Sequence, residues 1–153
     1  MKRAIFLTVM IISLIFNNCS AGNKDNKVKK PATNDIVLSL TNEAFKKMIF
    51  NYDVNKEWKY EDSKPAIIDF YADWCPPCRQ LSPLVEEIAK EYNGKIVVYK
   101  VNTNEEKGLA QSMGISSLPT LLYIPVKGKP QITLGMLPKE TIVKMINEIL
   151  LTK

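Results

Sequence analysis

The segment Asp69 to Leu84, DFYADWCPPCRQLSPL, constrains this chain most, because it sets two cysteines around a Pro-Pro pair between a strand and a helix. The run Ala66 to Tyr71, which overlaps its start, is short, apolar and rich in strand-forming residues, as in a strand buried on both faces. Apolar side chains then recur at helical spacing at Leu81, Leu84, Val85, Ile88, Ala89 and Tyr92. The helix therefore begins near Pro76 and places Cys75 at its N-cap.

The rest of the chain from residue 36 onward alternates strand and helix patterns. We expect strands at 36–40, 96–101, 118–125 and 131–135, helices after Thr41, over 105–113 and from Pro138 onward, and a loop at 51–64. Strand 66–71, its helix and strand 96–101 form a βαβ unit, whose strands are parallel. The sequence therefore predicts an α/β fold, a mixed sheet of about five strands flanked by about four helices on both faces.

Two cysteines three positions apart have three common uses. Structural zinc needs four ligands, and this chain has no histidine and no second cysteine pair. An inert disulfide gains little from so small a loop. In a redox dithiol, the helix N-terminus stabilises the Cys75 thiolate, which attacks a disulfide. Cys78, one turn into the helix and expected to be less exposed, then resolves the mixed disulfide.

Three stretches together resemble the thioredoxin family: the run DFYADWCPPC, the segment SLPTLLYI, and Gly135 after the next strand. The resemblance covers residues 36–150 and implies a thioredoxin fold and dithiol–disulfide exchange, with no cofactor. Family members usually have Gly-Pro between the cysteines, where this chain has Pro76-Pro77. The extra proline removes an N–H that could stabilise the Cys75 thiolate and also stiffens the loop, so its net effect on reduction potential is open.

The resemblance assigns acid–base roles to two further residues. Asp69 takes the place of the family's buried carboxylate, where an unpaired charge is costly, so we expect a raised pKa and proton transfer from Cys78. The alternative is an Asp that is hydrogen-bonded to backbone at a strand end. Lys100 matches the lysine beside that carboxylate and shares strand parity with Val98, so we expect it to face inward rather than into solvent.

The resemblance also implies a substrate groove beside Cys75. Pro119 takes the position of the family's cis-proline, which leaves the backbone of Leu118 free to pair with an extended substrate. The residues expected to form a flat apolar groove are Trp74, Pro76, Leu118, Pro119, Gly135 and Met136. Simple core packing is the alternative for Trp74.

The N-terminus predicts export. We predict that residues 1–18 are a signal peptide of lipoprotein type and that Cys19 is the lipidated residue. Residues 19–35 are predicted to form a flexible tether, and residues 36–153 the thioredoxin domain. The alternative is ordinary cleavage after Ala21. With the resemblance, this pattern predicts a lipid-anchored protein on the periplasmic side of a bacterial cell envelope, with no other membrane contact.

The charge of the folded part gives no support for a nucleic-acid partner, and none is expected. The formal charge of +5 falls to +1 over residues 36–153, which hold 15 basic and 14 acidic side chains. We expect a monomer that acts on disulfide-containing exported proteins as a reductase or isomerase, together with an unidentified redox partner such as a membrane electron donor. The alternatives are a non-catalytic peptide-binding module and a thiol metal carrier, the latter weakened by the absence of histidine.

Overall fold

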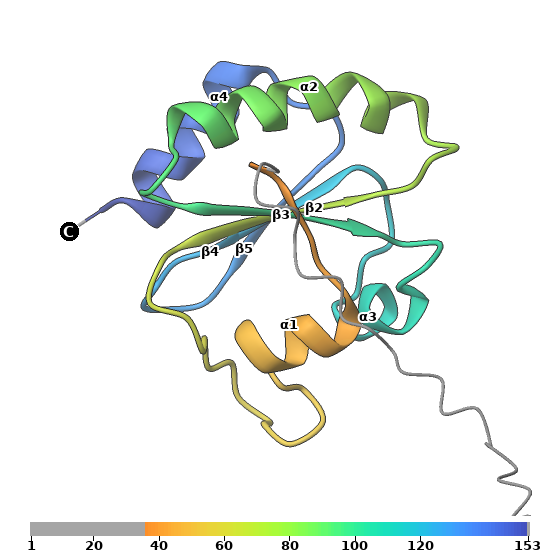
Figure 1. Cartoon of the computed structure of the whole chain (residues 1–153), viewed down its shortest axis with the longest axis vertical. Coiled ribbons are helices and arrows are strands. Elements are labelled where there is room, and N and C mark those ends of the chain that lie inside the picture. The colour runs from red at the N-terminus through yellow and green to blue at the C-terminus, as the bar shows by residue number, and fades with distance from the viewer. Residues whose placement is uncertain (1–35, 153) are drawn as a thin grey trace, which may run out of the picture.

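The computed structural model describes residues 36–152 (Figure 1), so the predictions for 1–18, 19–35 and Cys19 lie outside the described residues. The elements, in chain order, are β1 (Leu38–Ser39), α1 (Asn42–Met48), β2 (Ala66–Tyr71), α2 (Pro76–Glu91), β3 (Val97–Asn102), α3 (Lys107–Ser112), β4 (Thr120–Ile124), β5 (Gln131–Leu134), α4 (Lys139–Met145) and η1 (Ile146–Leu150).

These strands form one five-stranded sheet in the order β1-β3-β2-β4-β5. Strand β3 pairs in parallel with both β1 and β2, whereas β4 is antiparallel to β2 and to β5. Helix α2 connects the parallel strands β2 and β3, so the predicted βαβ unit is present. The mixed α/β thioredoxin fold is thereby confirmed.

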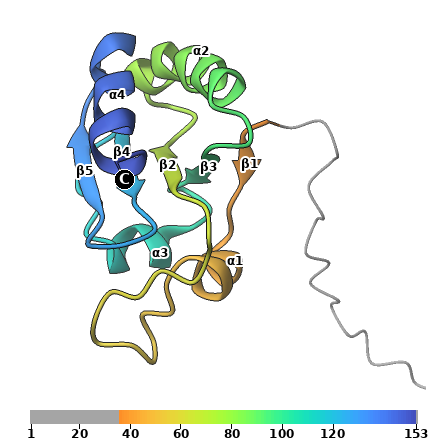
Figure 2. The same cartoon turned by 90° about the vertical axis from the view of Figure 1, so that its left-hand side faces the viewer.

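Helices cover the sheet on both sides: α2 and α4 lie on one face, and α1 and α3 on the other (Figures 1 and 2). Strand β2 lies at the centre, and its side chains alternate between the two layers. Ile67 belongs to the core under α2 and α4, whereas Ile68 belongs to the core on the α1 side. Both are almost fully buried, which explains the nearly continuous apolar run of this strand.

Several boundaries differ from the expected ones. Strand β1 has two residues instead of five, because only Leu38 and Ser39 pair with β3. Pro138 is the N-cap of α4 rather than a residue of its first turn, and α4 continues directly into a π-helical turn, η1. Within residues 36–152, no helix has both the length and the apolar character needed to cross a membrane.

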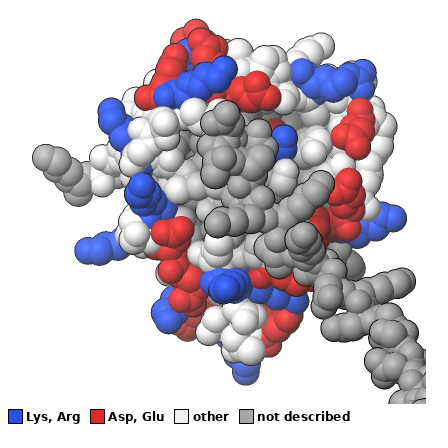
Figure 3. All heavy atoms as spheres, in the orientation of Figure 1, with Lys and Arg blue, Asp and Glu red and all other residues white. Residues whose placement is uncertain are grey.

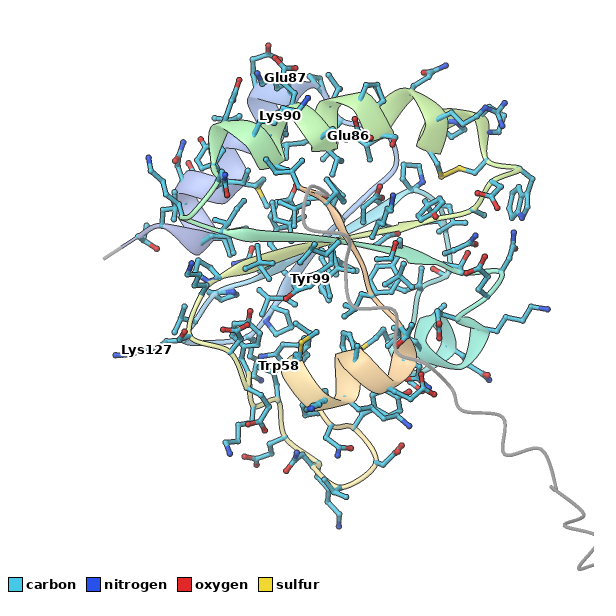
Figure 4. All side chains as sticks on the ribbon, in the orientation of Figure 1. Trp58, Glu86, Glu87, Lys90, Tyr99 and Lys127 are labelled. Atoms are coloured by element: carbon cyan, nitrogen blue, oxygen red, sulfur yellow. A yellow bond between two sulfur atoms is a disulfide. The ribbon has the colours of Figure 1, made fainter. Side chains whose placement is uncertain are left out.

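The 51–64 loop packs its aromatic side chains onto the α1 side of the sheet. Trp58, labelled in Figure 4, stacks near Phe50 with ring centroids 4.8 Å apart, and Tyr52 lies 6.3 Å from Phe45. Trp58, Tyr52 and Tyr60 are partly buried against the core on that side. On the face shown in Figure 3, acidic and basic side chains are intermixed, in keeping with the small net charge of the domain.

Candidate active site

Cys75 is the N-cap of α2, as predicted, with extended backbone angles of φ −88° and ψ 106°. Helix starts leave N–H groups without intrahelical partners, but Pro76 and Pro77 have no N–H. Cys78 therefore supplies the first available amide, which donates to Cys75 Sγ at 3.3 Å. In the dithiol state, the same amide and the helix dipole favour a thiolate at Cys75.

The two cysteines form a disulfide, with an S–S distance of 2.06 Å (the yellow bond at the start of α2 in Figure 4). Both residues are 2% exposed, because they pack with Ala72 and are flanked by Tyr71 and Leu118. The expectation that Cys78 is less exposed than Cys75 is therefore wrong for the disulfide form.

Asp69 lies in the middle of β2 and is only 4% exposed. Within residues 36–152, no hydrogen-bond donor reaches its Oδ1 atom, and the residue lies within the strand, so it is not the strand-end Asp of the alternative interpretation. Burial raises the pKa of Asp69 to about 7, and the Lys100 ammonium opposes this shift by lowering it. The predicted rise in pKa is confirmed.

Asp69 and Cys78 line one cavity of about 200 Å³ that opens beside the start of α2. Lys100 is half-buried and also lines this cavity, so it faces inward as predicted. The remaining lining residues are Tyr71, Ala72, Asp73, Arg79 and Ser82. A carboxyl group of near-neutral pKa and a cysteine that border the same cavity can exchange a proton directly or through water.

A second hollow, of about 430 Å³, lies on the other side of the disulfide. Its walls are Trp74, Cys75, Pro76, Pro77, Thr103, Ile115, Ser116, Ser117 and Leu118. The predicted residues Trp74, Pro76 and Leu118 are thus brought together beside Cys75. The hydroxyl groups in the wall make this groove partly polar, in contrast to the flat apolar surface that was expected.

The other three predicted groove residues do not line this hollow. Pro119 follows Leu118 through a cis peptide bond, as the resemblance implies, and its carbonyl accepts the N–H of Gly135 at 2.8 Å. Met136 is 41% exposed and comes next in the chain. These residues therefore extend from the Leu118 wall toward β5.

Trp74 is 67% exposed, which excludes core packing for this side chain. Its Nε1–H donates to Oδ1 of Asn104 at 3.1 Å, so the indole is held across the end of β3. Sequence reasoning missed Asn104. Asn104 follows the carboxyl end of β3, which lies beside the carboxyl end of the parallel strand β2. Its position directly after a strand could therefore have indicated that it lies near the cysteines.

Arg79 and Ser82 were also missed as cavity residues. They follow Cys78 by one and four positions on α2, and the helical repeat could have placed Ser82 one turn beyond Cys78. The Arg79 guanidinium donates to the Asp73 carbonyl at 3.0 Å across the helix start. In residues 36–152, no cluster of three or more His, Cys, Asp or Glu side chains could hold a metal ion.

The site agrees with what the chain is similar to. Residues 36–148 match the Thioredoxin family. The chain is 43% identical over 113 residues to thioredoxin of Borreliella burgdorferi, which covers 74% of this chain and 97% of that protein. It is 40% identical over 103 residues to thioredoxin 1 of Nostoc sp., covering 67% and 87% of the two chains.

A solved structure agrees as well. The crystal structure of chloroplastic thioredoxin z superposes with a TM-score of 0.61 at 28% identity and covers 73% of this chain and 92% of that one. Fold, cysteine pair and relatives lead to one conclusion. The chain belongs to the thioredoxin family and is a disulfide oxidoreductase of the thioredoxin type.

Proposed function

We propose that the chain reduces or isomerises disulfides of exported proteins on the periplasmic side of a cell envelope. The observation that carries the proposal is the Cys75–Cys78 disulfide at the start of α2, with a substrate groove on one side and the Asp69 cavity on the other. The placement in the envelope is supported by the signal-like residues 1–18 and by Cys19.

The reductive reaction proceeds in two exchanges. The Cys75 thiolate attacks one sulfur of a client disulfide, which forms a mixed disulfide and releases one client thiolate. Cys78 then loses its proton to the Asp69 carboxylate and attacks Cys75 Sγ, which expels the second client thiolate. Two electrons pass to the client, Cys75–Cys78 becomes the disulfide, and the proton on Asp69 returns to solvent or product.

A reducing or isomerising direction is favoured by the short connection after α2. Only 25 residues lie between Asn93 and Pro119, and they hold β3 and the six-residue helix α3. This leaves no room for the large helical insertion expected of strongly oxidising relatives. Continued reduction needs an electron donor, for which a membrane protein is the proposed partner.

Insulin reduction tests the enzymatic proposal. The wild-type chain should reduce insulin disulfides with dithiothreitol as donor, and Cys75→Ser should abolish the activity. Retention of full activity by Cys75→Ser would contradict the enzymatic mechanism. If a Cys75→Ser/Cys78→Ser variant keeps full function in the cell, the peptide-binding alternative is correct instead. Tight binding in a metal titration would favour the thiol metal carrier.

Localisation needs a separate measurement. Fatty-acid labelling and cell fractionation should show a labelled, membrane-associated chain that becomes unlabelled in Cys19→Ala. A chain that is exported but unlabelled would indicate cleavage after Ala21. A chain that stays in the cytoplasm would refute the envelope location.

A further inference from the structure

The edge strand β5 and the segment that directly follows it carry an apolar stripe, defined here as Ile132 and Leu134 in the strand and Met136 beyond its end. Their exposed fractions are 53%, 55% and 41%. Ile132 and Leu134 are two positions apart in a strand, so their side chains point to the same side of the sheet. Their cross-strand partners are Leu122 and Thr120, which places the stripe on the α1 and α3 side.

Ile132 and Leu134 also direct their backbone groups away from β4. Gly135 N–H bonds to the Pro119 carbonyl, and residue pairs alternate between hydrogen-bonded and non-bonded along an antiparallel ladder. Thr133 and Gln131 therefore continue the bonded positions opposite β4. The N–H and C=O of Ile132 and Leu134 face outward, where residues 36–152 provide no further strand (Figure 2).

Natural edge strands are usually protected by charged side chains or proline. The stretch 131–138, QITLGMLP, has no charged residue, and its one proline lies at the end beyond the stripe. The turn before β5 does contain Lys127, Lys129 and Pro130, but these precede the strand. The edge thus combines free backbone groups with exposed apolar side chains, the two requirements for adding a peptide strand.

We propose that the β5 edge binds an extended, apolar segment of an unfolded client polypeptide as an added β-strand. This inference rests on the proposed function and names its substrate class: clients that are unfolded around their disulfide. Continuity with the active-site groove identifies this occupant. The stripe reaches Gly135, which is bonded to Pro119, and Pro119 adjoins the Leu118 wall beside Cys75.

A second copy of the chain fits this edge less well. Stable interfaces bury about 1,200 Å² or more in total. A strand of four residues with two exposed apolar side chains, together with Met136 beyond its end, offers much less. A client that is bound at the Cys75 groove is already held close to β5, so a short added strand is enough to raise its affinity.

The test compares two lysine substitutions in the full chain. Ile132→Lys puts a charge in the stripe, and Val54→Lys puts the same charge on an exposed apolar residue of the 51–64 loop, outside the β5 edge. Each pre-reduced protein is mixed in single turnover with scrambled ribonuclease A or with 5,5′-dithiobis(2-nitrobenzoate). Ile132→Lys should raise the half-saturating ribonuclease concentration about fivefold or more and leave the small disulfide unaffected. Val54→Lys should match wild type with both substrates.

A backbone variant tests strand addition itself. Ile132→Pro and Ile132→Ala both remove the Ile132 side chain, but only the proline also removes the outward N–H, without breaking a bond to β4. Ile132→Pro should therefore weaken ribonuclease binding more than Ile132→Ala does, while the fold, followed by circular dichroism, is retained. Equal half-saturation by wild type, Ile132→Lys and Ile132→Pro would overturn the proposal. A wild-type dimer in sedimentation that Ile132→Lys dissociates would also overturn it, because a second copy would then occupy the edge.

Binding without redox chemistry separates the inference from the proposed function. The Cys75→Ser/Cys78→Ser variant should bind fluorescent, reduced and carboxymethylated ribonuclease A, and adding Ile132→Lys should weaken that binding by a similar factor. If wild type reduces neither disulfide yet this binding pattern holds, the proposed function fails and the strand site stands. If both disulfides are reduced but Ile132→Lys has no effect on binding, only the strand site fails.

Discussion

Asp69 and Lys100 are register partners on the adjacent parallel strands β2 and β3, and both line the cavity that Cys78 borders. Asp69 is the residue whose pKa burial raises from 3.8 to about 7, while the Lys100 ammonium acts in the opposite direction. The sheet therefore holds a carboxyl group that titrates near neutrality behind the disulfide. Both stability and the exchange reaction should depend on its protonation.

Asp69→Asn should make the protein more stable at alkaline pH. An Asp whose pKa is higher in the folded state favours folding below its unfolded pKa near 3.8, and this stabilisation is lost as pH rises through about 7. The difference of about three pKa units corresponds to about 4 kcal/mol. Urea unfolding of the oxidised protein at pH 8.5 should show a gain of this order for Asp69→Asn and a much smaller change at pH 4.

A matched control is Glu86→Gln, which removes a carboxylate from the exposed side of α2 (Figure 4). It should leave the difference in unfolding free energy between pH 4 and pH 8.5 within about 0.5 kcal/mol of wild type. Equal stabilisation by Glu86→Gln and Asp69→Asn at pH 8.5 would point to a general charge effect and contradict the role of burial at Asp69.

Lys100→Met should raise the pKa of Asp69 further, because it removes the charge that lowers it. Carboxyl-carbon NMR of the oxidised protein should show the Asp69 titration midpoint move upward, whereas Lys95→Met, whose charge lies outside this cavity, should leave it unchanged. A downward or absent shift in Lys100→Met would show that the ammonium does not act on this carboxyl group.

The central strands and α2 were predictable because their patterns are local and strong. The apolar run 66–71 and the helical repeat after Cys78 each had one plausible interpretation, and together they fixed Cys75 at the helix start. Strand β1 was overestimated, because its length depends on pairing with β3 rather than on its own apolar residues. The π-helical turn at Ile146–Leu150 could not be predicted, because an amphipathic pattern does not distinguish it from a continued α-helix.

Some residues of the site could likewise be identified from the sequence, and others could not. Cys75 and Asp69 stand out because a cysteine at a strand–helix junction and an acid in a buried strand are unusual. Asn104 and Ser117 are common polar residues on loops, and only the three-dimensional arrangement brings them to Trp74 and the groove. The burial of Cys75 depends on Leu118, which is distant in sequence, so the pattern around the cysteines could not show it.

Asn104→Ala should impair the reaction with protein substrates more than the reaction with small disulfides. The Asn104 oxygen holds the exposed indole of Trp74 over the groove, and loss of this bond frees the ring to leave the position that contacts a client. We expect a three- to tenfold lower kcat/KM for insulin, equivalent to about 1 kcal/mol. The control Asn55→Ala, in the 51–64 loop, should have no effect, and an equal loss in both variants would contradict this role.

Two glycine substitutions should have opposite effects on stability. Gly135 has φ +78°, where a side chain is strained even though a Cβ atom would meet nothing within 4 Å. Gly135→Ala should therefore lower the free energy of unfolding by about 1 kcal/mol.

Gly108 lies inside α3 with an ordinary φ, and its Cβ would only touch Asn42 Nδ2 at 4.0 Å. Gly108→Ala should raise the free energy of unfolding by about 0.5–1 kcal/mol. Equal effects of both changes in urea unfolding would show that backbone strain at positive φ does not govern the stability contribution of Gly135.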